Sequence, residues 1–252
     1  MIEVLILSII QGITEFLPIS SSSHLILTSN YLNFENQSLS IDISLHIGSF
    51  IAVITYFARD IISYAKNKLL FLKIIISSFP IMFFGYFLIK YGLIDQLRSI
   101  KIIGWTTIIF GILLYISDKF KVNKQLDKDF SFKSVIFIGI LQVLSLIPGV
   151  SRSGITITAS RILNFNRFDS AKISFLLSIP TLGAVTIFGF NNLIQTESVN
   201  FSLLNFIAII LSFIFSFLTI KYFLKFIKEF SLYIFVVYRI ILGVLILAFA
   251  YL

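Results

Sequence analysis

Residues 11–24 read QGITEFLPISSSSH, and they place polar side chains between two strongly apolar runs. Gln11 and Glu15 are four residues apart, so a helix would put them on one face. A carboxylate inside the hydrocarbon region of a membrane costs about 2.5–3.5 kcal/mol, even on insertion scales. A buried Glu15 could therefore bind a divalent cation, accept a proton or orient a serine. The alternative is that Glu15 lies at an interface and reaches water.

Four consecutive serines follow Pro18 in the same stretch. A serine at the start of a helix is a common N-cap, which is the alternative for Ser20 and Ser23. The N-terminus of a helix also binds phosphate through free amide groups. A serine such as Ser21 or Ser22 would then contact the anion, and it would be a nucleophile if a base lay close.

His24 is one of two histidines in the chain. A lone histidine on an apolar helix is usually a core residue. Beside Glu15 and the serine run, His24 instead favours acid–base or nucleophilic chemistry. His46 begins a long apolar segment and is assigned a structural role.

A second polar cluster, PGVSRSGIT, occupies residues 148–156. Its glycines permit tight turns, and Ser151, Arg152 and Ser153 bring hydroxyl groups and a guanidinium together. Arginine binds phosphate in a bidentate fork, which lysine cannot do. The alternative is that Arg152 only sets membrane topology. Together the two clusters predict one phosphate site, with Arg152 holding the anion and the first cluster acting on it.

The composition indicates what must position these clusters. Of 252 residues, 58% are hydrophobic and 13% are charged, whereas soluble domains carry about 25% charged residues. We therefore predict an all-α, multi-spanning membrane protein. The net charge is +8, and the basic residues lie in short loops between apolar runs. This distribution fits membrane topology rather than nucleic-acid binding. The absence of cysteine excludes disulfides, thiolate metal sites and a cysteine nucleophile. The N-terminus lacks the pattern of a signal peptide and is expected to be mature structure.

Six apolar runs are long enough to cross a membrane as helices, which takes about 20 residues. They lie near 41–58, 69–90, 101–117, 171–190, 201–220 and 233–252. Two further apolar regions, 1–32 and 134–164, are interrupted by the polar clusters. We predict that both are re-entrant helix–loop–helix hairpins, because non-helical backbone is tolerated at membrane depth only inside protein or beside a wet cavity.

The distribution of lysine and arginine predicts the topology. Segments 59–73 and 118–133 are rich in cations, whereas 30–40 and 191–200 contain none; segment 90–101 is discordant. The positive-inside rule then places both termini outside. One hairpin enters from each side, and each is followed by three spans. This is an inverted-topology repeat, in which sites form near the bilayer midplane.

We accordingly predict a single membrane domain, 1–252, with a first repeat at about 1–117 and a second at about 132–252. Sequence similarity between the halves is weak. Gln11 precedes Pro18 much as Gln142 precedes Pro148, and Ser21 and Ser151 each lie three residues after the proline.

These residues resemble the undecaprenyl-diphosphate phosphatase family, the integral-membrane enzymes linked to bacitracin resistance. QGITEFLPISSSSH is similar to the family's first signature and PGVSRSGIT to its second. The resemblance extends through DISLHIGSFIAV, through ISFLLSIP and to Tyr238-Arg239, so it covers essentially the whole chain. It departs from the family at Gln11, where many members have glutamate, and at Ser22-Ser23, where many have Thr-Gly.

The resemblance implies hydrolysis of undecaprenyl diphosphate, which recycles the lipid carrier for peptidoglycan synthesis. It implies an enzyme of the bacterial cytoplasmic (inner) membrane whose site opens to the periplasm. It also implies a divalent cation, Mg²⁺ or Ca²⁺, at Glu15 and Gln11, membrane lipids and a polyprenyl diphosphate as partners, no nucleic acid, and a homodimer in many members. The expected catalytic residues are Glu15, Ser21, His24 and Arg152. The expected substrate-binding residues are Gln11, Ser20, Ser22, Ser151, Ser153 and Thr156.

Two alternatives stay open from sequence. The nucleophile is Ser21, His24 or a water activated by His24, with Ser21 preferred. The second functional class is a transporter or flippase for a lipid phosphate, because inverted repeats and broken helices are frequent in transporters.

Overall fold

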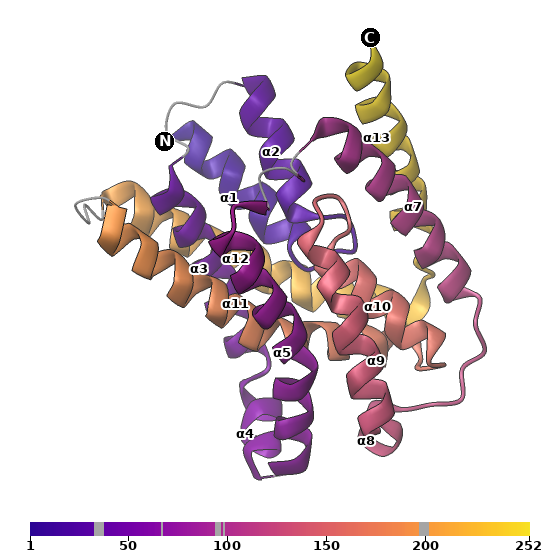
Figure 1. The fold of residues 1–252 in the computed structure, drawn as a ribbon. Helices are drawn as coiled ribbons and strands as arrows, with labels where there is room; N and C mark the ends of the chain where they lie inside the picture. The colour runs from indigo at the N-terminus through magenta and orange to yellow at the C-terminus, as the bar shows by residue number, and fades with distance from the viewer. Residues whose placement is uncertain (33–37, 67, 94–96, 98, 197–201) are drawn as a thin grey trace.

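The computed structural model describes residues 1–32, 38–66, 68–93, 97, 99–196 and 202–252, and no strand longer than an isolated bridge occurs among them (Figure 1). Six helices in this part of the chain are long and apolar enough to cross a membrane. They are α3 (Leu39–Tyr56), α5 (Lys68–Lys90), α7 (Ile100–Asp118), α11 (Arg167–Thr196), α12 (Leu203–Glu229) and α13 (Tyr233–Tyr251). The six predicted spans and the all-α class are confirmed.

The boundaries differ from prediction where polar residues are helical. α11 begins at Arg167 rather than 171, because the Asn166 side chain accepts a hydrogen bond from the Asp169 backbone N–H at 2.8 Å and caps the first turn. α12 continues to Glu229 through a lysine-bearing stretch. Two shorter helices, α4 (Ala58–Lys66) and α8 (Leu126–Asp129), occupy segments expected to be loops.

Each interrupted region forms two short helices joined by a break. The first contains α1 (Ile2–Thr14) and α2 (Ser21–Leu32). The second contains α9 (Phe132–Val143), the 3₁₀ turn η1 (Leu144–Leu146) and α10 (Arg152–Ile162). The residue before each second helix is a serine with positive φ, 76° at Ser20 and 62° at Ser151. The re-entrant orientation and the inverted repeat stay predictions.

Close packing between helices fixes α1 in the bundle. α1 packs on α12, and α12 packs along α3. A Cβ at Gly12 would lie 2.5 Å from the Cβ of Phe215, and one at Gly48 would lie 2.4 Å from the Ile209 carbonyl oxygen. Serines supply the polar contacts in the same interface: Ser212 donates to the Leu45 carbonyl at 2.7 Å, and Ser216 donates to Ser49 at 2.9 Å. Small residues and hydroxyl groups are the usual contacts between membrane helices.

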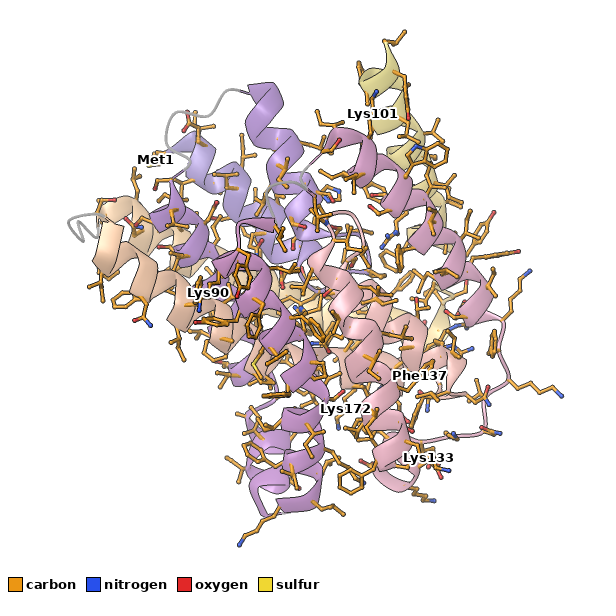
Figure 2. All side chains as sticks on the ribbon, viewed as in Figure 1. Met1, Lys90, Lys101, Lys133, Phe137 and Lys172 are labelled. Carbon is orange, nitrogen blue, oxygen red and sulfur yellow. The ribbon has the colours of Figure 1, made fainter. Side chains whose placement is uncertain are left out.

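The outer faces of the long helices are apolar. Phe79 is 58% exposed and Trp105 is 50% exposed, and Figure 2 shows such side chains projecting outward all around the bundle. Inside, the Phe175 ring packs on those of Phe16, Phe57 and Phe223 at centroid distances of 5.3, 6.3 and 5.8 Å. The long helices therefore carry apolar side chains both on their outward faces and on the faces that pack together, as expected of a multi-pass membrane protein.

Candidate active site

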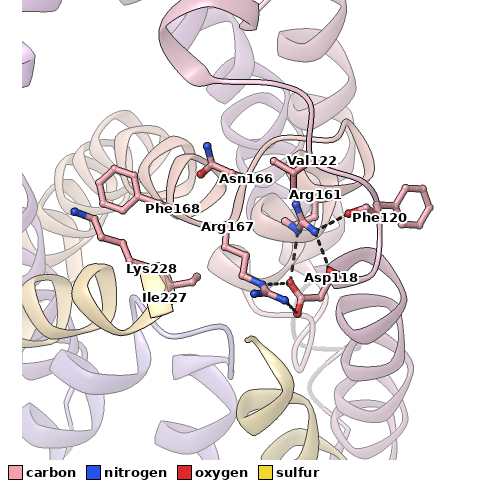
Figure 3. A pocket seen from close by; sticks show the side chains of 9 residues that line it. All are labelled: Asp118, Phe120, Val122, Arg161, Asn166, Arg167, Phe168, Ile227 and Lys228. Carbon is pink, nitrogen blue, oxygen red and sulfur yellow. Dashed lines mark hydrogen bonds and ion pairs between the residues drawn. The ribbon is translucent and has the colours of Figure 1, made fainter. Parts of the chain in front are cut away.

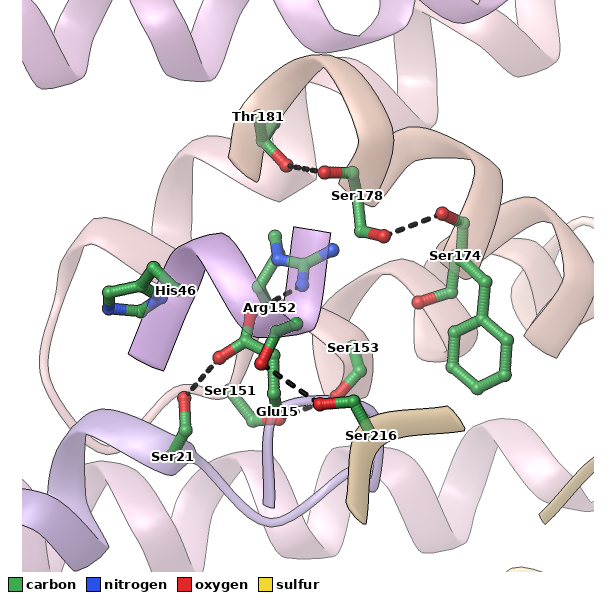
Figure 4. A network of polar contacts seen from close by, with 12 residues as sticks. Glu15, Ser21, His46, Ser151, Arg152, Ser153, Ser174, Ser178, Thr181 and Ser216 are labelled. Carbon is green, nitrogen blue, oxygen red and sulfur yellow. Dashed lines mark hydrogen bonds and ion pairs between the residues drawn. The ribbon is translucent and has the colours of Figure 1, made fainter. Parts of the chain in front are cut away.

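Glu15 lies at the centre of the candidate site, and its two carboxylate oxygens contact different halves of the chain (Figure 4). Its Oε1 accepts a hydrogen bond from Arg152 Nη2 at 2.6 Å, and its Oε2 accepts one from Ser21 Oγ at 2.7 Å. Glu15 is 7% exposed. The following residue, Phe16, is fully buried against Phe175, so the end of α1 is anchored where it presents the carboxylate.

Ser21 and Arg152 occupy equivalent positions, each being the first residue of its helix. The preceding serine has a left-handed backbone in both cases, which turns the chain sharply into the helix. The proline count predicted that Ser21 corresponds to Ser151. When the two regions are aligned by their helix starts, Ser20 corresponds to Ser151 and Ser21 corresponds to Arg152. The two alignments differ because the turns after Pro18 and Pro148 differ in length by one residue. Two helix N-termini therefore start beside one carboxylate.

Gln11 extends this network towards α3. Its Nε2 donates to Glu15 Oε2 and lies 3.1 Å from His46 Nδ1. Both amide hydrogens are used if His46 Nδ1 is the acceptor. The opposite amide orientation would point Gln11 Oε1 at the carboxylate. His46, expected to be structural, thus contacts the candidate site through Gln11.

His24 is held by contacts on both sides of its ring. Its Nδ1 lies 2.6 Å from the Ser20 carbonyl oxygen, and its Nε2 lies 2.6 Å from the Tyr238 hydroxyl. A carbonyl only accepts, so Nδ1 carries the proton and Nε2 of the neutral ring accepts from Tyr238. The two rings also stack, with centroids 5.8 Å apart. His24 thus lies on the same helix as Ser21 but presents an unprotonated nitrogen towards α13.

The other expected serines divide by exposure. Ser20 and Ser23 are buried, and their hydroxyl oxygens lie 3.0 Å apart. Ser22 is exposed and lies 3.4 Å from Ser20. Ser20 and Ser23 thus contact each other at the start of α2, while Ser22 remains accessible.

In the second cluster, Ser151 is the N-cap of α10 and accepts a hydrogen bond from the Gly154 backbone N–H at 3.1 Å. Ser153 donates to the Leu17 carbonyl at 2.7 Å, which joins the two breaks. Thr156 is fully buried and donates to Ser174 at 2.7 Å. The structure therefore brings Ser151 and Ser153 beside Arg152, whereas the Thr156 hydroxyl is engaged one turn further along α10.

Arg239 is a residue whose role in the site sequence reasoning missed. It lies in α13, is fully buried, and donates to four backbone carbonyls. These carbonyls come from both breaks and from α7: Pro18, Gly149, Val150 and Thr107. The available signal was an arginine in the middle of an apolar span, which is a default pointer to function in membrane proteins.

The described residues contain no group of three or more His, Cys, Asp and Glu side chains that could hold a metal ion by themselves. The oxygen donors still suit a hard cation. Gln11 Oε1 is buried without a hydrogen-bond partner, and Glu15 supplies one carboxylate. Mg²⁺ is commonly bound by one or two carboxylates together with substrate phosphates. The residues therefore fit a cation shared with a phosphate ligand rather than an all-protein cage.

Comparison with known proteins supplies a family. A family model described as bacitracin resistance protein BacA matches residues 4–245. The undecaprenyl-diphosphatase of Pelagibacter ubique is 48% identical, over 99% of this chain and 98% of that protein. The undecaprenyl-diphosphatases of a Jannaschia species and of Saccharophagus degradans are 41% and 40% identical, over 98% and 94% of this chain and 97% and 93% of those proteins.

Proposed function

Because the chain belongs to the bacitracin resistance protein BacA family, we propose that it hydrolyses undecaprenyl diphosphate to undecaprenyl phosphate and inorganic phosphate. The chain is then a membrane-bound hydrolase of cell-wall synthesis, linked to bacitracin resistance. A lipid-phosphate transporter is not favoured, since the similar curated proteins carry the name of an enzyme. The observation that supports the site is the position of Glu15 between Ser21 and Arg152.

In the proposed mechanism, the prenyl tail stays in lipid and the diphosphate enters between the two breaks. Arg152 leaves Glu15 and forms a bidentate contact with the phosphate. Loss of the guanidinium from its carboxylate makes Glu15 a stronger base. The N-termini of α2 and α10 add amide groups and positive dipole ends for the same anion.

Ser21 is the preferred nucleophile. Its Oγ attacks the terminal phosphorus while its proton passes to Glu15 Oε2, to which it already donates. The bridging P–O bond breaks, and its electron pair leaves with undecaprenyl phosphate. Water then attacks the phosphoserine, and the Ser21 oxygen regains a proton as inorganic phosphate departs. Positioning and charge stabilisation supply most of the rate in phosphoryl transfer.

His24 is the acid–base partner in this scheme. Its unprotonated Nε2, directed at Tyr238, can take a proton from the water of the second step. The rival schemes make His24 the nucleophile or let it activate water for direct attack. When bound, a divalent cation held by Glu15 and the Gln11 amide oxygen would neutralise charge on the diphosphate.

The membrane orientation, the partners and the oligomeric state are also proposed. The N-terminus, and with it the site's entrance, is proposed to face the periplasmic side of a bacterial inner membrane, and the distribution of lysine and arginine among the loops supports this orientation. No nucleic-acid partner is needed for this chemistry. A homodimer is an expectation from the family alone.

The experiment is phosphate release from undecaprenyl diphosphate by purified protein in detergent, with Mg²⁺, with Ca²⁺ and with EDTA. Ser21→Ala should lower kcat by about a thousandfold or more, because it removes the nucleophile. The control is Thr55→Ala, which deletes an exposed hydroxyl that donates to the Ile51 carbonyl of its own helix.

Trapping separates the nucleophiles. Acid-quenched enzyme should carry covalent phosphate in His24→Ala, where the second step is slowed, but not in Ser21→Ala. Near-normal turnover in Ser21→Ala would reject the serine and move the chemistry to His24 or water. Absence of release from well-folded wild-type protein with every metal would reject the proposed function itself.

A further inference from the structure

A polar cavity that shares no lining residue with the candidate active site lies where several helices end (Figure 3). Its volume is about 490 Å³, and it lies among the end of α7, the end of α10, the start of α11 and the end of α12. The lysine-rich segments around it are those that the positive-inside rule assigns to the cytoplasm. We call it the inner-face cavity.

The inner-face cavity carries excess positive charge. Arg161, Arg167 and Lys228 line it, with Asp118 as the carboxylate among its lining residues. Arg167 forms a forked contact with Asp118, Nε to Oδ1 at 2.7 Å and Nη2 to Oδ2 at 3.0 Å. This pairing neutralises one cation and leaves two positive charges on the lining. The start of α11 adds the positive end of a long helix dipole.

Arg161 gives the cavity a rigid, buried base. It is 2% exposed, and its two Nη atoms donate to the carbonyls of Phe165, Asp118 and Phe120. Its Nε has no hydrogen-bond partner and lies 3.6 Å from Asp118 Oδ1. The Asp118 carboxylate is thus the nearest charged group to this Nε, and Arg161 supplies fixed positive charge at the base of the cavity rather than a contact to a ligand.

The remaining walls are apolar or amphipathic. The Lys228 ammonium lies 4.6 Å from the centroid of the Phe168 ring, and the Lys228 side chain is exposed at the rim of the cavity. Phe120, Val122 and Ile227 are the other apolar residues of the lining, and Asn166 is a polar one. Cations beside aliphatic and aromatic groups, at the ends of membrane spans, suit a ligand with a charged head and an apolar body.

From this cavity we infer a binding site for the phosphate of an anionic glycerophospholipid. Basic pockets between helices at the cytoplasmic face bind such headgroups, and arginine matches phosphate geometry. Inorganic phosphate shares the same charged group but would leave the apolar walls uncovered, so the lipid is the favoured source. The inference does not depend on the hydrolase activity.

The test uses the full chain, delipidated in a non-ionic detergent. Phosphatidylglycerol, phosphatidylcholine and inorganic phosphate are each titrated while thermal unfolding and native mass spectra are recorded. Phosphatidylglycerol should raise Tm and remain bound in the spectra; phosphatidylcholine should do so far less. Lys228→Gln should weaken phosphatidylglycerol binding about fivefold, the usual contribution of one lysine near an anionic surface.

The matched control is Lys133→Gln, which removes an exposed lysine from α9 at the same end of the bundle but outside the cavity. It should leave the binding constant unchanged. Arg167→Lys is the second variant, since it keeps the charge opposite Asp118 while removing the fork. Equal losses in Lys228→Gln and Lys133→Gln would overturn the site in favour of diffuse surface charge. Equal stabilisation by inorganic phosphate and phosphatidylglycerol would overturn the lipid assignment.

Discussion

The two interrupted regions share a backbone design and differ in side chains. In each, an apolar helix ends before a proline-containing turn, a serine with positive φ redirects the chain, and a new helix begins. The first helical residue is Ser21 in one region and Arg152 in the other, and both donate to Glu15. The same local geometry thus delivers a hydroxyl from one side and a guanidinium from the other.

The difference between the regions is a division of chemical roles. The first region contains the carboxylate, the histidine and the serine run, which can move protons and bonds. The second contains the arginine, whose charge is fixed at any physiological pH. In the proposed mechanism, the anion clamp and the proton-transfer groups therefore lie on separate elements, so each can be tested separately.

After the loss of Ser21, the largest expected effect comes from changing the clamp alone. Arg152→Lys keeps the positive charge but loses the fork, so kcat/KM for undecaprenyl diphosphate should fall about 10–100-fold, the equivalent of one strong charged hydrogen bond. Arg59→Lys, an exposed position, should have no effect. Wild-type turnover in Arg152→Lys would show that the second region contributes only charge.

The next prediction tests whether Arg239 stabilises both regions. Arg239→Met removes hydrogen bonds to both breaks at once, so the free energy of unfolding should fall by about 2 kcal/mol or more. Thermal unfolding in detergent measures it, with Arg59→Met as the surface control. Unchanged stability together with full activity would mean that the regions hold their positions independently.

A smaller effect is expected in the first region, which alone has a histidine. Tyr238→Phe removes the donor to His24 Nε2, so kcat should fall about three- to tenfold. A free Nε2 gains protons more readily, so the acidic limb of the pH–rate profile should move to higher pH. An altered rate with an unmoved profile would make Tyr238 a packing residue rather than a positioning residue for His24.

The smallest effect compares the two glutamines that precede the breaks. Gln11 bonds to Glu15 and lies against His46, whereas both polar atoms of Gln142 are buried without a partner among the described residues. Gln11→Leu should cost about 1–2 kcal/mol of stability. Gln142→Leu should be neutral or stabilising, because it removes buried polar atoms that have no partner. Equal losses of stability in the two variants, measured by thermal unfolding, would show that the two glutamines do not differ in their contribution.

Much of this architecture is accessible from sequence, for physical reasons. Long apolar runs between cationic loops allow little besides membrane helices, so all six spans could be predicted. Pro18, Pro148 and Gly149 disfavour a regular helix, so the breaks could be located as well. Four-residue spacing placed Gln11 beside Glu15 correctly.

Other features depend on contacts between distant segments. The pairing of Ser20 with Ser151 follows from the backbone of each turn, which a count from the prolines misses by one residue. Arg239 has a role only because three separate segments direct carbonyls at it. His46 looked structural because its partner, Gln11, is 35 residues away. These relations are set by tertiary packing, which no local pattern encodes.

The ion pair of Glu15 with Arg152 also has a meaning for biosynthesis. The two residues are 137 positions apart, so a ribosome that has made the carboxylate must add more than half of the chain before its guanidinium exists. Until then the growing protein has Ser21 and His24 but no clamp for an anion. In the proposed mechanism, a chain that ends before residue 152 therefore has the proton-transfer groups without the side chain that holds the anion.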